Sequence, residues 1–281
     1  MKFALRLFVV FLGAASAFLK GAEDPALTAR DIMARVAANQ DRGNKLRSEY
    51  VYHQHIHIAT RKSNNKIMRE ESVDYLVIPT AGGTKKELKL ITGRYWHKGR
   101  YIEFKGEPVP EEDSLDGDMI HDFREDLSDE HSKDGMARDY FPLTTEEQKK
   151  YQFRLMGRET LQRREVYHLG FRPKEKDDIA WAGEAYIDSA EFEPVTVFTK
   201  LSRPIPFLIR TFLADLPGVG FNVQYGRQPD GVWFPTSFGT EFRFRLFMFL
   251  SREITISLEN TAFEHTHVET RIKSVELPPD H

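Results

Sequence analysis

The sequence predicts a mainly β protein: a strongly curved antiparallel sheet, or incomplete β-barrel, with one N-terminal helix and a helical lid insert. Most of the chain after residue 50 alternates apolar and polar residues with a period of two, which is typical of strands that cover a core on one side. About a dozen such runs follow one another at short spacing, as in curved sheets and barrels. A helical pattern is found near the start and in an acidic insert at about 105–150.

The first segment has the pattern of a secretory signal peptide. Two basic residues precede the uncharged run Leu7–Leu19, and the small residues Ala15–Ala17 resemble a cleavage site. The run is shorter than the about 20 residues that a membrane-spanning helix needs. We therefore expect residues 1–17 to be removed and residues 18–281 to form a single periplasmic domain; an uncleaved membrane anchor is the alternative.

Composition excludes several classes of function. The 281 residues are 40% hydrophobic and 30% charged, with a net charge of -3, which argues against a protein that coats nucleic acid. Cysteine is absent, so disulfides, cysteine nucleophiles and thiolate metal sites are excluded. The cysteine that bacterial lipoproteins acylate is also missing. We expect a protein that is neither lipid-anchored nor an integral membrane protein after cleavage.

The elements follow in order from local patterns. The segment Pro25–Asp41 is helical, with Thr28 as the candidate N-cap and Asp31 placed as in a capping box. The glycines Gly82, Gly83, Gly93 and Gly99 are expected in turns. Strands are expected at 50–59, 73–77, 87–92, 94–104, 151–157, 165–171, 184–188, 194–201, 221–225, 241–248 and 254–259.

The insert is the most acidic part of the chain. Residues 105–135 hold twelve acids and three bases, a balance of -9. The run Asp116–Asp118 does not continue with the ligand spacing of an EF-hand, so a solvated helix face is favoured over a calcium site. One face of the expected helix is apolar and would dock on the sheet as a lid. Its residues are Met119, Ile120, Phe123 and Leu127.

Three histidines alternate along one expected strand and are the best candidates for a metal site. His53, His55 and His57 would point the same way, with neighbours almost 7 Å apart. A zinc site needs three or four converging ligands, which His265 and His267 would complete only if the fold brought them close. A polar, solvent-facing strand edge is favoured over a metal site, and a histidine pH sensor is a further alternative.

Enzyme signatures are absent from the sequence. It has no Gly-X-Ser-X-Gly, no His-Glu-X-X-His and no phosphate-binding loop, so we expect no enzyme and no cofactor. The most apolar stretch after the first segment is 205–213, which includes Phe207, Leu208 and Phe212. It is either a buried core element or a surface that contacts a lipid or a protein partner.

The second half of the chain contains a series of motifs that occur together in one known family. They are Arg154–Glu159, Arg164–Leu169, Phe171–Lys174, Trp181, Ala185–Asp188, Pro194–Val195 and Val232–Thr236. In these motifs the chain resembles the outer-membrane lipoprotein-sorting (LolA/LolB-like) family. The resemblance covers about residues 150–263, with weaker support from the helix and strand at 28–58.

The resemblance implies an incomplete barrel around helices, with an apolar cavity that shelters acyl chains under a lid. The leading hypothesis is thus a periplasmic carrier or binding protein for a lipid or lipoprotein acyl chain. The alternatives are an envelope protein that uses the fold to dock a protein partner, and a metal-dependent enzyme. The aromatic residues of the late strands are the candidate cavity wall, each with plain core packing as its alternative: Phe221, Tyr225, Trp233, Phe238, Phe242 and Phe244.

Overall fold

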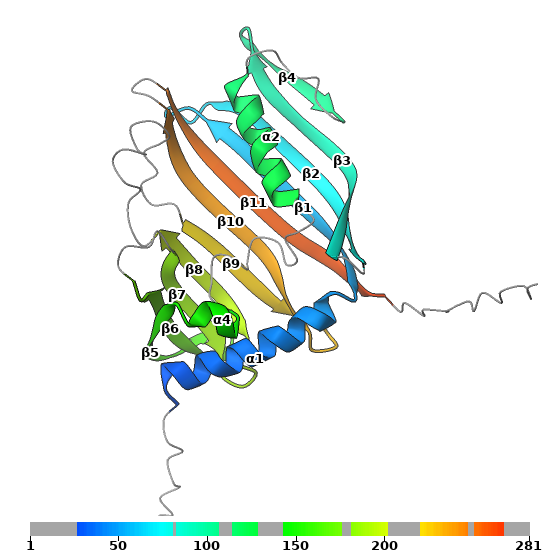
Figure 1. Ribbon diagram of the computed structural model, residues 1–281. Helices are drawn as coiled ribbons and strands as arrows, with labels where there is room; N and C mark the ends of the chain where they lie inside the picture. Colours follow the sequence, from blue (N-terminus) through cyan, green and yellow to red (C-terminus); the bar gives the residue numbers. More distant parts are fainter. Residues whose placement is uncertain are drawn as a thin grey trace, which may run out of the picture.

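The computed structural model is built on one open antiparallel sheet of eleven strands, with helices on one face (Figure 1). It describes residues 27–80, 83–106, 114–128, 143–175, 181–201, 220–246 and 250–266. The strand order is β4-β3-β2-β1-β11-β10-β9-β8-β7-β6-β5, so the first and last strands of the chain, β1 and β11, pair in the middle. The strands are β1 (Tyr50–Arg61), β2 (Ile67–Thr80), β3 (Gly83–His97), β4 (Arg100–Lys105), β5 (Tyr151–Leu161), β6 (Arg164–Pro173), β7 (Trp181–Asp188), β8 (Pro194–Leu201), β9 (Gly220–Arg227), β10 (Trp233–Leu246) and β11 (Leu250–His265).

The sheet buries one face and leaves the other largely polar. On β1, Ile56 and Ile58 are fully buried, whereas His53 and His55, which point to the opposite face of the strand, are exposed. On β11, Ile254, Ile256 and Leu258 are buried in the same core. The predicted fold class, a curved antiparallel sheet with an N-terminal helix, is therefore confirmed, and the sheet is not closed into a barrel.

Helix α1 (Ala29–Arg47) begins where the sequence predicts. Thr28 accepts a hydrogen bond from the Asp31 backbone, and the Asp31 carboxylate accepts one from the Thr28 backbone, which completes the capping box. The Thr28 hydrogen bonds also lower the pKa of Asp31. The helix continues six residues beyond the expected end at Asp41, and its buried face packs against β5 and β10.

Two shorter helices come from the insert. Helix α2 (Leu115–Ser128) packs on β1 and β2, and the single turn α4 (Thr145–Gln148) lies against α1 and β5. Figure 1 shows α2 and α1 over opposite parts of the same face of the sheet. Among the described residues, no helix has both the length and the apolar character needed to cross a bilayer.

One predicted boundary is wrong. The expected pieces 87–92 and 94–104 are instead one long strand, β3, followed by a hairpin turn at Lys98 and Gly99 and then β4. Gly93 is not a turn residue, because a Cβ there would lie 2.4 Å from the Glu70 carbonyl oxygen. The glycine at this position serves the close approach of neighbouring strands, which a local sequence pattern does not distinguish from a turn.

Two glycines on different faces test this packing. A Cβ at Gly183 on β7 would lie 1.9 Å from the Phe198 carbonyl oxygen, whereas a Cβ at Gly239 on β10 would meet nothing within 4 Å. We expect Gly183→Ala to lower the free energy of unfolding by at least about 2 kcal/mol, and Gly239→Ala to change it by less than about 0.5 kcal/mol. Urea denaturation measures both, and equal effects of the two substitutions would contradict the described strand packing.

Candidate functional site

A continuous row of apolar residues crosses the helix-covered face of the sheet. Each member lies directly opposite the next on the neighbouring strand, so the row runs across ten of the eleven strands without a polar residue. We call it the apolar row. Its members, from β3 to β5, are Ile91, Val73, Ile56, Leu258, Phe238, Val223, Val197, Ala185, Leu169 and Leu155.

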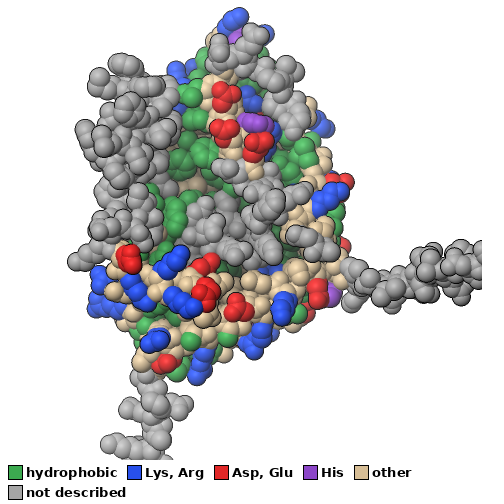
Figure 2. Space-filling model, viewed as in Figure 1, with side chains coloured by type: hydrophobic (Ala, Val, Ile, Leu, Met, Phe, Trp, Pro, Cys, Tyr) green, Lys and Arg blue, Asp and Glu red, His purple; other side chains and the backbone are tan. Residues whose placement is uncertain are grey.

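The row beside it on the same face is mixed and contains two threonines, a phenylalanine and a glycine. Thr240, Phe221, Thr199 and Gly183 follow one another across β10, β9, β8 and β7. The Thr240 hydroxyl donates to the Gly220 carbonyl oxygen over 2.7 Å. Among the described residues, the buried Thr199 hydroxyl has no hydrogen-bond partner. In Figure 2, hydrophobic side chains are visible on this face beside α2.

Four of the predicted cavity-wall aromatics belong to this face. Tyr225 and Phe238 are buried in the core, and Phe221 and Phe242 are partly buried against it. The Phe221 ring lies 5.0 Å from the Phe238 ring and 4.7 Å from that of Trp181, measured between centroids. Phe221 and Phe242 therefore join the core while keeping part of their surface accessible.

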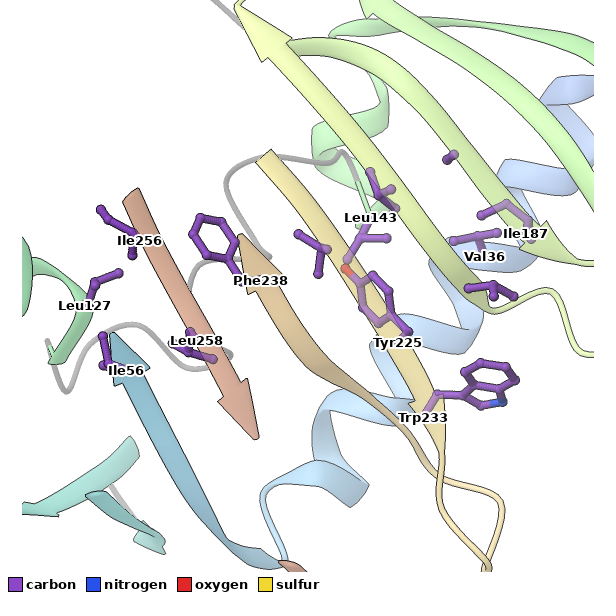
Figure 3. Close-up of a cluster of buried hydrophobic side chains, with 14 of the residues drawn as sticks. Val36, Ile56, Leu127, Leu143, Ile187, Tyr225, Trp233, Phe238, Ile256 and Leu258 are labelled. Carbon is purple, nitrogen blue, oxygen red and sulfur yellow. The ribbon is translucent and has the colours of Figure 1, made fainter. Parts of the chain in front are cut away.

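Of the other two predicted wall residues, Trp233 belongs to the same core cluster as Tyr225 and Phe238 but contacts a different part of the molecule. Trp233 is buried at the opposite end of β10, where its indole Nε1 donates to Glu191 over 2.9 Å. In Figure 3, Tyr225 lies between the Trp233 ring and Phe238. The side chain of Phe244 lies outside the described part of the structure.

The four apolar residues predicted for the lid lie on the sheet-facing side of α2. Ile120 and Leu127 are buried, and Met119 and Phe123 pack against the same core. The Phe123 ring meets the Phe242 ring edge to face at 5.9 Å. In Figure 3, Leu127 points from α2 toward Ile56 and Ile256. The packing of α2 on the sheet is thus described, while its role as a lid stays a prediction.

Buried ion pairs attach α2 to the sheet. Asp116 accepts two hydrogen bonds from the Arg252 guanidinium of β11, at 2.8 and 3.0 Å. On β2, Glu71 binds Arg69 at 2.7 Å and also Arg124 of α2 at 3.3 Å. All five side chains are less than one tenth exposed as residues. Because these pairs are buried, removing one partner would leave the other charge buried without compensation, which destabilises the folded state.

The sequence analysis missed these charged residues, although a signal was present. The inward phase of Val73 and Val77 extends back along β2 to Glu71 and Arg69. The phase of Ile254 on β11 likewise extends back to Arg252. Charged residues in the apolar phase of a strand indicate buried pairs, since burying an unpaired charge is unfavourable.

A second polar cluster joins α1 to the turn between β7 and β8. The Gln40 side chain donates to the Glu193 carboxylate over 2.5 Å. Arg47 donates to Gln40 and to the Trp233 carbonyl oxygen, and Asn39 donates to the Glu191 carbonyl oxygen. Burial raises the pKa of Glu193 to about 7, although the Arg47 charge and the Gln40 hydrogen bond oppose the rise.

The candidate metal histidines lie on the polar face of β1, a central strand rather than a sheet edge. His55 binds Asp74 at 2.7 Å and His57 contacts Ser72 at 3.1 Å. Burial lowers the pKa of His57. His265 pairs with Glu49, and His267 lies outside the described residues. Within the described ranges, no group of three or more potential ligands is arranged to hold a metal ion.

The apolar stretch 205–213, with Phe207, Leu208 and Phe212, lies outside the described residues, as does the expected signal peptide. Neither prediction is tested by the structure.

Comparison with known proteins finds relatives by structure only. No family model and no curated sequence matches the chain. Solved structures that are similar include an outer membrane lipoprotein-sorting protein domain from Vibrio parahaemolyticus, with 11% identity and a TM-score of 0.39, covering 88% of this chain and 95% of that one.

Two further structures have the same level of similarity. A DUF1329 family protein from Desulfovibrio piger has 11% identity and a TM-score of 0.39, covering 85% of this chain and 93% of that one. A LolA superfamily protein from Nitrosomonas europaea has 11% identity and a TM-score of 0.35, covering 85% and 94%. The resemblance expected from the sequence is therefore found among solved structures; at these TM-scores it carries no argument about ligand or partner.

The Asp116–Arg252 pair tests how α2 is attached. Asp116→Asn leaves the Arg252 guanidinium buried without its full counter-charge, a change that costs about 3–5 kcal/mol in buried pairs. We expect amide hydrogen exchange across residues 115–128 to accelerate at least tenfold. The matched control is Asp116→Leu combined with Arg252→Leu, which removes both charges and should restore most of the protection. Unchanged exchange in Asp116→Asn would contradict the anchoring role.

Glu193 makes stability depend on pH. An unfolded glutamate loses its proton near the ordinary value of 4.5, whereas folded Glu193 keeps it until about 7. The folded state therefore binds more protons between these values, and this residue's contribution to stability falls as the pH rises through that window. We expect Glu193→Gln to abolish the fall and to stabilise the protein by on the order of 1–3 kcal/mol at pH 8.

The measurement is the difference in unfolding free energy between Glu193→Gln and the unsubstituted protein from pH 4 to pH 8. The difference should be small at pH 4 and should grow toward pH 7. Glu165→Gln, at an exposed position on β6, is the matched control. A difference that is constant with pH would show that Glu193 ionises normally.

Proposed function

We propose that the protein is a periplasmic binding protein, or carrier, for the acyl chain of a lipid or lipoprotein. In this proposal residues 1–17 are removed on export, residues 18–281 form one domain, and the acyl chain lies along the helix-covered face of the sheet. The protein acts by binding rather than by catalysis, and α2 serves as the lid.

The observation that carries the proposal is the apolar row. An acyl chain is a long, unbranched apolar ligand, and each buried methylene contributes about 0.8 kcal/mol. The row forms a continuous apolar surface across ten strands. Nine of its ten members, all except Leu155, are buried in this structure, so a bound chain would replace part of the protein's own cover over the sheet. Helix α2 packs over β1 and β2, and α1 over β5 and β10, so these two helices lie toward different parts of the row.

The accessible parts of Phe221 and Phe242 support the same location. Both rings pack against the core on one side and are only partly buried. Phe242 also contacts Phe123 of α2, so a movement of α2 would change the surroundings of this ring. A ligand held between the sheet and α2 would replace contacts of this kind.

A second candidate function is docking of an envelope protein partner. Strand β5 is an edge strand, so one side of its backbone is unpaired in the described sheet. Its inward side chains, Tyr151, Phe153 and Leu155, are partly buried and continue the core to that edge. An extended segment of a partner that added to β5 would extend both the sheet and its apolar face.

The first test is native mass spectrometry of the protein purified from its own cell envelope. A co-purifying mass of a lipid or of acyl groups supports the carrier. A stoichiometric protein adduct with no lipid favours docking, and it counts against the carrier together with a failure to bind a fluorescent fatty acid.

Substitutions then locate the bound chain. Phe221→Gln combined with Phe242→Gln should weaken binding of a fluorescent sixteen-carbon fatty acid about tenfold or more, because each ring contributes apolar contact. The matched control is Phe198→Gln, which removes a 46% exposed phenylalanine from the polar face of β8. Equal affinities of the two variants, with both still folded by circular dichroism, would place the ligand elsewhere.

A further inference from the structure

Two hairpin turns meet at one end of the sheet. The first comprises residues 61–66, from the last residue of β1 to the start of β2, and the second comprises residues 97–101, from the last residue of β3 into the first two residues of β4. Two contacts show that these turns are neighbours. The Tyr101 hydroxyl donates to the Ile67 carbonyl oxygen over 3.3 Å, and the Lys66 ammonium lies 3.2 Å from the centre of the Trp96 ring. We call these two turns, with Trp96, the basic end.

The basic end carries a concentration of positive charge in an acidic protein. Its two turns contain five lysines and arginines and no aspartate or glutamate, whereas the whole chain has a net charge of -3. Lys62, Lys98 and Arg100 are exposed, and Lys66 is half-buried. Within the part of the chain that the structure describes, none of these four forms a salt bridge. Figure 2 shows Lys and Arg side chains gathered at this tip.

Aromatic rings are interleaved with these cations. The Tyr101 ring is 38% exposed, meets the Trp96 ring edge to face at 5.1 Å, and has the Arg94 guanidinium over it at 4.8 Å. Tryptophan and tyrosine beside lysine and arginine suit a membrane surface, where ring and aliphatic parts enter the interface and charges meet headgroups.

The β3–β4 turn holds a lysine in an unfavourable backbone conformation. Lys98 has φ +43°, in the left-handed region, followed by Gly99 at φ +92°. Asparagine or glycine is normally preferred at both central positions of such a hairpin. A lysine at the outermost point of the tip therefore adds charge rather than turn stability.

We propose that the basic end docks the protein onto the surface of a bilayer that contains anionic phospholipids. The exposed lysines and arginines of this end and the anionic headgroups attract each other. The outward residues of α2, Asp118, Asp122 and Glu125, are exposed acids and would be repelled by the same surface. Their position favours contact through the tip and disfavours contact through α2.

The experiment is co-sedimentation of the full chain with vesicles of equal parts phosphatidylglycerol and phosphatidylcholine, compared with pure phosphatidylcholine. Binding only to the anionic vesicles, and its loss when salt is raised from 50 mM to 500 mM, is expected from screening of exposed charges. The variant Lys62→Gln, Lys98→Asn, Arg100→Gln should bind at least tenfold more weakly, because each basic residue near such a surface adds about a fivefold factor. Asparagine suits the left-handed position, so this variant keeps the turn.

The matched control has the same change in net charge at another place. Arg30→Gln, Lys45→Gln and Arg163→Asn remove three exposed cations, the last also from a left-handed position. This variant should bind anionic vesicles as the unsubstituted protein does. Equal loss in both variants, equal binding to both kinds of vesicle, or retention on an anionic polysaccharide without vesicle binding would overturn the proposal.

Docking and acyl-chain binding are tested separately. The vesicle experiment needs no acyl ligand, and the basic-end variant should bind the fluorescent fatty acid with unchanged affinity. If the fatty acid does not bind to any form of the protein, the proposed carrier function fails while the docking result stands. If the basic-end variant loses fatty-acid affinity as well, the tip acts on the fold rather than on the membrane, and the docking proposal fails.

Discussion

The structure depends on the pairing register of its strands, because this register places the apolar side chains of all the strands on the same face of the sheet. Side chains alternate between the two faces, so a slip of one residue in a single pairing would turn that strand's apolar side outward. The register irregularities in β1 fall at Val51/His53 and Thr60/Arg61, on either side of Ile56. In β5 the irregularity follows Leu155, and in β10 it precedes Phe238. The pairings along the apolar row itself are direct, which keeps ten residues from distant parts of the chain in line.

This register also decides where charge must be buried. On β2 the positions in phase with Val73 include Glu71 and Arg69, and on β11 the position in phase with Ile254 is Arg252. The sheet alone would leave these groups without their full set of partners. Helix α2 supplies Asp116 and Arg124 and thereby completes both pairs. The acidic insert is thus partly explained by the sheet: its helix carries apolar residues for the core and charges for the strands.

Much of the fold was predictable because it depends on patterns among residues that are close together in the sequence. The capping box of α1 requires only Thr28 and Asp31, and the apolar face of α2 requires only spacing along one helix. The strand alternation is also local, so most strands were expected near their observed positions. The exceptions come from contacts between strands, as at Gly93, where the backbone of β2 and the Phe104 ring leave no room for a side chain.

The candidate site was less predictable, because it requires knowing which strands are neighbours. The pairing of β1 with β11 joins the two ends of the described chain, and no sequence pattern indicates it. Six late-strand aromatics were selected as one wall, yet Trp233 lies at the end of β10 that meets α1, away from Phe238. The sequence indicates which face of the sheet a side chain points to. How far along its strand the residue lies from the apolar row depends on how the neighbouring strands are paired, which the sequence does not indicate.

The two helices over the core are held by carboxyl groups that act in opposite directions. On α2, each carboxylate oxygen of Asp116 accepts a hydrogen bond from the Arg252 guanidinium, so its negative charge attracts the helix to the sheet. Under α1, burial opposes ionisation of Glu193 more strongly than Arg47 and Gln40 favour it, which raises its pKa to about 7. The negative charge of Asp116 therefore stabilises the attachment of α2, whereas a negative charge on Glu193 weakens the attachment of α1. Because Glu193 accepts a hydrogen bond from Gln40 of α1, we expect a rise in pH through this range to weaken this attachment of α1.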